Sequence, residues 1–126
     1  MRLLLDTHIF IWWDRQLRRV PADVRAVIED GANEIFVSAA SVWEIAIKRA
    51  SRKLQFASDI AATSERLGFR LLVITAPHAE HAGGLPRHHG DPFDRLLIAQ
   101  AMLEGLVLAT QDPQMRPYRV PTLGLG

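Results

Sequence analysis

The stretch that decides the fold is DPFDRLLIAQAMLEGLVLATQD, residues 91–112. It predicts a helix that begins at Asp91-Pro92, because aspartate caps helix N-termini and proline suits the first turn. Gly105 should end that helix, a short apolar strand over 106–109 follows, and Asp112 comes just past it. A helix that leads directly into a buried strand is typical of α/β domains with a parallel sheet.

The same alternation of short apolar runs and helical patterns continues upstream and downstream. Strands are predicted at 2–6, 34–38 and 70–75, with one edge strand near 119–120. Helices are predicted at 7–14, 21–30, 39–50, 58–67 and 77–83. We therefore expect one α/β domain over residues 1–126, with a mainly parallel sheet of four to five strands.

Composition excludes several classes of protein. Of the 126 residues, 48% are apolar and 23% are charged, which argues against disorder. The absence of cysteine excludes a disulfide-stapled module, thiolate zinc sites and a cysteine nucleophile. No apolar run approaches the roughly 20 residues needed to span a bilayer. The first five residues resemble the start of a secretory signal peptide, but Asp6 interrupts their apolar run. These features favour a cytoplasmic protein that makes no membrane contact.

Two aspartates follow predicted strands. Asp6 ends the first strand, and Asp112 lies just past the strand at 106–109. In open α/β sheets, ligands bind outside the carboxyl ends of the strands, so both residues are candidates for a functional site. The alternative is that each aspartate only caps a turn or a helix.

Asp94 is more informative, because it shares helical i, i+3, i+4 and i+7 spacing with Leu97, Ile98 and Ala101. An acid on an apolar stripe is costly to bury unless it is paired or binds metal. The alternative is that Asp91 is the N-cap and that Asp94 only favours the helix dipole. Capping explains Asp91 well, but it does not explain why Asp94 lies on the apolar face.

Glu44 lies on or beside the apolar face of the helix predicted at 39–50. The alternative is an exposed i, i+4 ion pair with Lys48, worth about 0.2–0.5 kcal/mol. Four carboxylates that meet would repel one another, and a divalent cation with oxygen ligands, Mg²⁺ or Mn²⁺, would relieve the repulsion. Fifteen basic residues would then face ten other acids, an excess that suits a polyanionic substrate.

Four segments together carry a family resemblance. They are LLLDTH (3–8), SAASVWEIAIK (38–48), HHGDPFDRLLIAQA (88–101) and ATQD (109–112). In this order they resemble the four acidic motifs of PIN-domain ribonucleases. The residues around each acid are similar to those of VapC-type toxins from bacterial toxin–antitoxin pairs. The resemblance runs from residue 1 to about residue 120.

The resemblance implies a three-layer α/β/α sandwich and an endoribonuclease that depends on Mg²⁺ or Mn²⁺. It also implies a homodimer and a small VapB-type antitoxin that covers the acidic pocket. The metal-binding and catalytic acids it implies are Asp6, Glu44, Asp94 and Asp112, with Asp91 as a possible outer ligand. The hydroxyls it implies around them are those of Thr7, Ser38 and Thr110.

The segment after Glu44 is unusually basic for this resemblance and lacks the glycine often found there. Its cations, Lys48, Arg49, Arg52 and Lys53, either contact RNA phosphates or form a solvated face. Arg95 points away from the Asp94 face, where it either binds phosphate or pairs with an acid.

Histidines and tryptophans give weaker signals. His88 and His89 either line a substrate groove or belong to a solvated loop, and the loop is the safer interpretation. The pair His78 and His81 has too few ligands in reach to favour zinc. The two adjacent tryptophans, Trp12 and Trp13, are expected in the core or a dimer interface rather than stacked on bases.

Other functions remain as alternatives. A phosphotransfer enzyme with an aspartate nucleophile would carry a second aspartate where this chain has His8. A phospho-acceptor module would place an aspartate after the third strand, where ITAP (74–77) has none. A PIN fold that only binds RNA would be expected to lose at least one of the four acids.

Overall fold

The structure is a computed structural model that describes residues 1–56 and 59–126. Its described residues form a five-stranded sheet with the order β3-β2-β1-β4-β5, and every neighbouring pair is parallel. The strands are β1 (Arg2–Leu5), β2 (Glu34–Ser38), β3 (Arg70–Leu72), β4 (Val107–Ala109) and β5 (Thr122–Leu123). The expected parallel α/β sheet is confirmed, with all five strands parallel.

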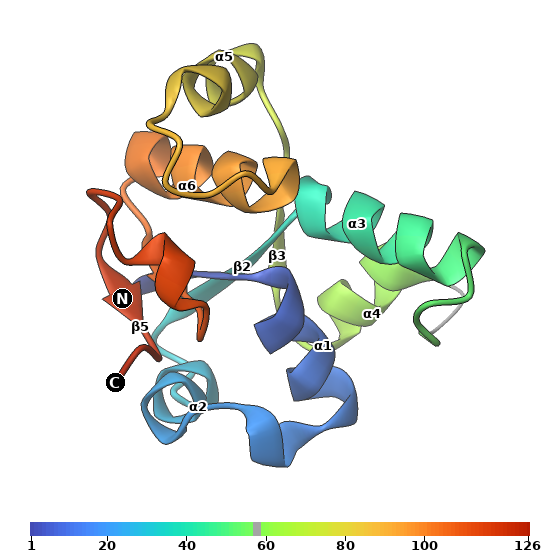
Figure 1. Ribbon diagram of the computed structural model, residues 1–126. Helices are drawn as coiled ribbons and strands as arrows, with labels where there is room; N and C mark the ends of the chain where they lie inside the picture. Colours follow the sequence, from blue (N-terminus) through green and yellow to red (C-terminus); the bar gives the residue numbers. More distant parts are fainter. Residues whose placement is uncertain (57–58) are drawn as a thin grey trace.

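Helices cover both faces of this sheet (Figure 1). The helices are α1 (Thr7–Arg15), α2 (Ala22–Glu29), α3 (Ala39–Ala50), α4 (Ile60–Arg66), α5 (Ala76–Gly84) and α6 (Pro92–Glu104). The two short 3₁₀ helices are η1 (Leu17–Arg19), between α1 and α2, and η2 (Pro113–Met115), between β4 and β5. Among the described residues, no helix has both the length and the apolar composition needed to cross a membrane.

The apolar run of β1 explains the three layers. Leu3 and Leu5 pack in one core cluster with residues of α1, α2 and α4, whereas Leu4 packs in the other with α5 and α6. Successive side chains of a strand point to opposite faces, so a continuous apolar run needs helices on both sides. The predicted three-layer α/β/α sandwich follows from this alternation and is confirmed.

Two strand predictions were wrong by more than one residue at an end. The third strand stops at Leu72, which pairs with Ser38, the last residue of β2. Residues 73–75 therefore have no partner on that side, and Thr75 caps α5 instead. The last strand lies at Thr122–Leu123, where it pairs with Leu108 and Ala109, and not at residues 119–120.

His78 and the two tryptophans have structural roles, whereas His81 is exposed. His78 is buried, its Nδ1 accepts the backbone N–H of Thr75, and its Nε2 lies 3.1 Å from Glu104 Oε2. Trp12 and Trp13 are partly buried against the core cluster of α1.

The predicted helix start at Ser58 lies outside the described residues, and α4 begins after its N-cap, Asp59.

Candidate active site

Asp6 lies where β1 ends and α1 begins, at the carboxyl edge of the sheet. Its backbone N–H donates to the Ala109 carbonyl, 2.9 Å away, which holds it against the end of β4. Its Oδ1 accepts the N–H of Ile9 at 2.8 Å and so caps α1. Burial raises the pKa of this carboxyl, against the opposing effect of a hydrogen bond with Thr110. Asp6 is therefore both a helix cap and a buried acid.

Thr110 connects two of the predicted acids. Its hydroxyl shares a hydrogen bond with Asp6 and accepts the backbone N–H of Asp112 at 3.0 Å. Asp112 uses Oδ1 to cap η2 through the N–H of Gln114, 2.9 Å away. The negative charge of Asp112 also contributes to raising the pKa of Asp6, which places the two carboxylates within electrostatic reach of each other.

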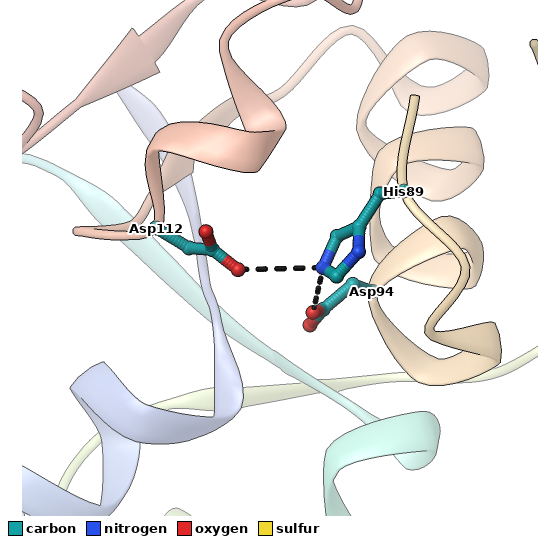
Figure 2. A group of neighbouring side chains, drawn as sticks. All are labelled: His89, Asp94 and Asp112. Carbon is teal, nitrogen blue, oxygen red and sulfur yellow. Dashed lines mark hydrogen bonds and ion pairs between the residues drawn. The ribbon is translucent and has the colours of Figure 1, made fainter. Parts of the chain in front are cut away.

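Asp94 faces the same site from the first turn of α6. Burial raises its pKa to about 7, and the negative charges of Asp91 and Asp6 add to the effect. His89 opposes the rise, since its Nε2 lies 2.7 Å from Asp94 Oδ2. The same nitrogen lies 3.3 Å from Asp112 Oδ2, so the imidazole stands between two carboxylates (Figure 2).

Asp91 is the N-cap of α6, as the capping alternative predicted. Its Oδ1 accepts the backbone N–H groups of Phe93 and Asp94 at 2.8 and 3.1 Å. The carboxylate therefore orients the turn that carries Asp94. No contact of Asp91 tests the prediction that it is an outer metal ligand, and that role stays a prediction.

Glu44 is both a buried acid and a partner of Lys48, the two alternatives that the sequence left open. It forms the i, i+4 pair with Lys48, whose Nζ lies 2.8 Å from Glu44 Oε2, but the side chain is only 6% exposed. The other oxygen, Oε1, is buried and has no hydrogen-bond partner. Among the described residues, the group of clustered ligand atoms contains His89, Asp94 and Asp112, and neither Asp6 nor Glu44 is a member.

The geometry agrees with comparisons with known proteins. The profile described as "PIN domain" matches residues 3–120, nearly the whole chain. The chain belongs to the PIN-domain family. It is 34% identical over 122 residues to Ribonuclease VapC22 of Mycobacterium tuberculosis (strain ATCC 25618 / H37Rv). The aligned residues cover 94% of this chain and 93% of that ribonuclease.

Two solved structures show the same fold. The DNA-bound VapBC of Salmonella typhimurium has a TM-score of 0.69 at 18% identity, and it covers 98% of this chain and 97% of its own. VapBC-1 of nontypeable Haemophilus influenzae has a TM-score of 0.67 at 21% identity, with the same coverage. The family resemblance carried by the four acidic segments is confirmed by the profile match and by the 34% identity to the ribonuclease.

Two predicted hydroxyls of this PIN domain hold helices. Thr7 Oγ1 lies 2.9 Å from Ser41 Oγ and joins α1 to α3. Ser38 accepts the N–H of Ala40 as the cap of α3 and donates to Gln100 Oε1 on α6. In these contacts both hydroxyls act on the elements that carry the acids, whereas Thr110 contacts the acids themselves.

The predicted basic residues divide into four groups. Arg49 is half-buried on the last turn of α3. Arg95 donates to the carbonyls of Ala82, Leu85, Pro86 and His89, so it clamps the loop before α6. Lys48 pairs with Glu44. Arg52 and Lys53 are exposed beyond the end of α3, and Arg52 has φ 60°, a left-handed conformation that glycine adopts more readily.

His89 is the site residue that sequence analysis placed wrongly, because the solvated-loop interpretation was favoured. Its side chain is only 11% exposed. The loop of residues 85–91 has no periodicity that predicts where a side chain points. The signal that could have found it is its position five residues before Asp94, ahead of a helix whose start is set by Asp91-Pro92.

Proposed function

We propose that this PIN domain is a metal-dependent endoribonuclease and the toxin of a type II toxin–antitoxin pair. The observation that carries the proposal is the meeting of Asp6, Asp94 and Asp112 at the carboxyl ends of β1 and β4. The substrate class is supported by the 34% identity to a protein named a ribonuclease. Hydrolysis of RNA phosphodiester bonds is the reaction that both observations favour.

The residues present fit a divalent cation. Burial and neighbouring carboxylates raise the pKa values of Asp94 and Asp6, which shows that negative charge is unfavourable there without a cation. Glu44 Oε1 is a buried acceptor without a hydrogen bond. Carboxylate oxygens are the ligands that Mg²⁺ and Mn²⁺ prefer. Asp94 and Asp112 already lie in one group of ligand atoms, and Asp6 and Glu44 would complete the set of acids that holds the ion.

A divalent cation in such a site activates water and stabilises the charge that develops on phosphate oxygens. The chain's own residues prepare the site for this chemistry. Thr110 fixes the positions of Asp6 and Asp112 relative to each other. Asp91 orients the first turn of α6, which carries Asp94. With its pKa near 7, Asp94 can exchange a proton for a cation at neutral pH.

The proposed partner is a VapB-type antitoxin, and the proposed assembly contains two toxin chains. Both solved structures named above are toxin–antitoxin complexes with this fold. An arginine of the antitoxin could bond a carboxylate of the acidic site through two nitrogens at once. Such a contact would inhibit by occupying the acids needed for RNA cleavage.

The remaining alternative is a PIN fold that binds RNA without cleaving it. Cleavage of single-stranded RNA, mapped at nucleotide resolution, distinguishes the two. We expect cuts with Mg²⁺ or Mn²⁺ and none in excess chelator. Asp94→Asn should lower the rate by at least about 100-fold, since loss of a ligand should cost no less than loss of a ligand's hydrogen-bond partner.

The matched control is Asp59→Asn, which changes an aspartate N-cap on α4 and should leave cleavage unchanged. Equal cleavage in chelator would contradict metal dependence. RNA binding with no cleavage at any metal concentration would favour the non-catalytic alternative.

A further inference from the structure

One nitrogen atom lies inside the acidic group of the proposed site. His89 Nε2 is 2.7 Å from Asp94 Oδ2 and 3.3 Å from Asp112 Oδ2, and the ligand atoms of the three residues all lie within 4.8 Å of one another. We infer that His89 is a ligand of the bound cation, so that the site has mixed nitrogen and oxygen ligands. This inference rests on the proposed function, which supplies the cation.

The observed distances suit ligands that share one ion. In an octahedral site with bonds of about 2.1 Å, adjacent ligand atoms are about 3 Å apart. The two nitrogen–oxygen distances of His89 lie on either side of that value. The imidazole nitrogen is therefore already spaced from each carboxylate oxygen much as neighbouring ligands of one ion would be.

The loop that carries His89 is held in place by two side chains. The buried Tyr118 accepts the backbone N–H of His89 at 2.9 Å and donates its hydroxyl to the Pro86 carbonyl at 2.8 Å. Arg95 donates to the carbonyls of the same two loop residues, at 3.2 Å for His89 and 3.0 Å for Pro86. Both ends of the loop are thus tied to the domain, which fixes the imidazole at the acids.

The neighbouring sequence explains this arrangement. Asp94 and Arg95 are adjacent on α6, so their side chains leave the helix in different directions. Asp94 faces the site, while Arg95 clamps the loop that returns His89 to Asp94. The His88 ring instead stacks edge-to-face on Tyr118, with ring centroids 5.2 Å apart. Of the two adjacent histidines, His89 is therefore the one that serves the site.

A nitrogen ligand changes which metals the site prefers. Mg²⁺ is a hard ion that favours oxygen ligands, whereas imidazole suits transition-metal ions better. His89 should therefore increase the preference of the site for Mn²⁺ over Mg²⁺. Replacing the imidazole with an amide should weaken Mn²⁺ binding by at least about tenfold. The same replacement should change Mg²⁺ binding much less, so the preference for Mn²⁺ should narrow.

The test is pulsed electron paramagnetic resonance of Mn²⁺ bound to the full chain, with ¹⁵N incorporated only in histidine. We expect the nitrogen coupling of a directly coordinated imidazole in the wild type and its loss in His89→Gln. Affinities for Mn²⁺ and Mg²⁺ are measured by calorimetry on the same samples. His88→Gln is the matched control, because it removes the adjacent histidine and should keep both the coupling and the affinities.

The outcomes separate this inference from the proposed function. Bound Mn²⁺ without nitrogen coupling in the wild type would overturn the role of His89 and leave the metal-dependent nuclease standing. Coupling that persists in His89→Gln would overturn it as well. A wild-type chain that binds neither ion would contradict the proposed function itself. Should His89→Gln fail to fold, His89→Asn gives the same test, since it also replaces the one histidine in the ligand group of the described residues by an amide.

Discussion

At the scale of single residues, the site is defined by acids that the fold makes costly to ionise. Asp94 is 19% exposed, lies near Asp91 and Asp6, and has a pKa of about 7. In the unfolded chain the same carboxyl would titrate near its ordinary value of 3.8. The folded chain without metal therefore binds more protons than the unfolded chain between these two values.

This difference predicts how the stability of the metal-free protein depends on pH. Because the folded state holds the extra proton, stability should fall as pH rises from about 4 to about 7 and level off above that range. Urea unfolding in chelator at several pH values measures it. Asp94→Asn should reduce the slope over this range. A wild-type stability that rises steadily from pH 5 to pH 7.5 and is unaffected by Asp94→Asn would contradict the assignment.

Asp6 allows a second prediction at this scale. Asparagine can keep the Oδ1 cap to Ile9 while removing a charge that burial makes unfavourable. We expect Asp6→Asn to raise the melting temperature of the metal-free protein by about 2–5 °C, equivalent to roughly 1 kcal/mol for a domain of this size. Added Mn²⁺ should stabilise the wild type more than the variant, because a ligand that binds only the folded state adds stability.

Calorimetric melting with and without Mn²⁺ measures both effects. The control Asp59→Asn changes an exposed N-cap, which accepts the N–H of Ala62 at 2.8 Å. It should change neither melting temperature by more than a degree or so. A metal-induced shift of the same size in the wild type and in Asp6→Asn would show that Asp6 does not contribute to the cation site.

At the scale of elements, the short strands β4 and β5 position the acids. The Thr110 N–H donates to the Leu123 carbonyl at 2.9 Å, which continues the pairing of β4 with β5 beyond the strand ends. Gly124 follows with φ 103°, and a Cβ atom there would lie 2.7 Å from the Thr110 carbonyl oxygen. The chain therefore needs glycine at this position both for its conformation and for the close approach.

Gly124→Ala should consequently affect the site as well as stability. The left-handed conformation alone costs about 1–2 kcal/mol, and the contact should also displace Thr110, which holds Asp6 and Asp112. We expect lower stability in urea unfolding and weaker Mn²⁺ binding at a temperature where the variant is folded. Gly105→Ala is the control, because Gly105 has φ 66° but nothing within 4 Å of a Cβ. Unchanged metal affinity in Gly124→Ala would show that Thr110 does not depend on this contact.

At the scale of the whole molecule, charge is unevenly placed. The net charge is only +1, yet acids gather at the carboxyl edge of the sheet, on the side where RNA is proposed to bind. Arg52 and Lys53 are exposed past the end of α3, where the Lys53 N–H donates to the Lys48 carbonyl at 2.9 Å. We expect both side chains to contact the RNA backbone beside the acidic site and not the phosphate that is cleaved.

Reversing both charges, Arg52→Glu with Lys53→Glu, should weaken RNA binding and reduce its salt dependence by about two phosphate contacts. The cleavage rate at saturating RNA should be nearly unchanged. Binding titrations at several salt concentrations measure RNA affinity and its salt dependence. Single-turnover cleavage at saturating RNA measures the cleavage rate. The control reversal, Arg2→Glu with Arg70→Glu, lies at the opposite ends of the strands and should leave RNA binding nearly unchanged. Lost turnover with intact affinity would place Arg52 and Lys53 at the reaction centre.

Much of this molecule follows from local sequence. The bounds of β2 and α3 were predicted to the residue, and α6 begins after Asp91 and ends before Gly105 as expected. These elements are set by caps, by glycine and by apolar periodicity, which act over a few residues. The apolar run of β1 and the aspartate that follows it likewise predicted a buried strand with an acid at its end.

Tertiary structure alone decided the features that depend on distant partners. β3 ends at Leu72 because β2, its only neighbour among the described strands, ends at Ser38. Asp6, whose charge adds to the rise in the pKa of Asp94, lies 88 residues away in the sequence. His89 reaches Asp94 and Asp112 because Arg95 and Tyr118 shape its loop, and Tyr118 lies 29 residues away. Local sequence determines helix and strand ends, whereas burial, charge neighbours and loop direction arise only when separate segments pack together.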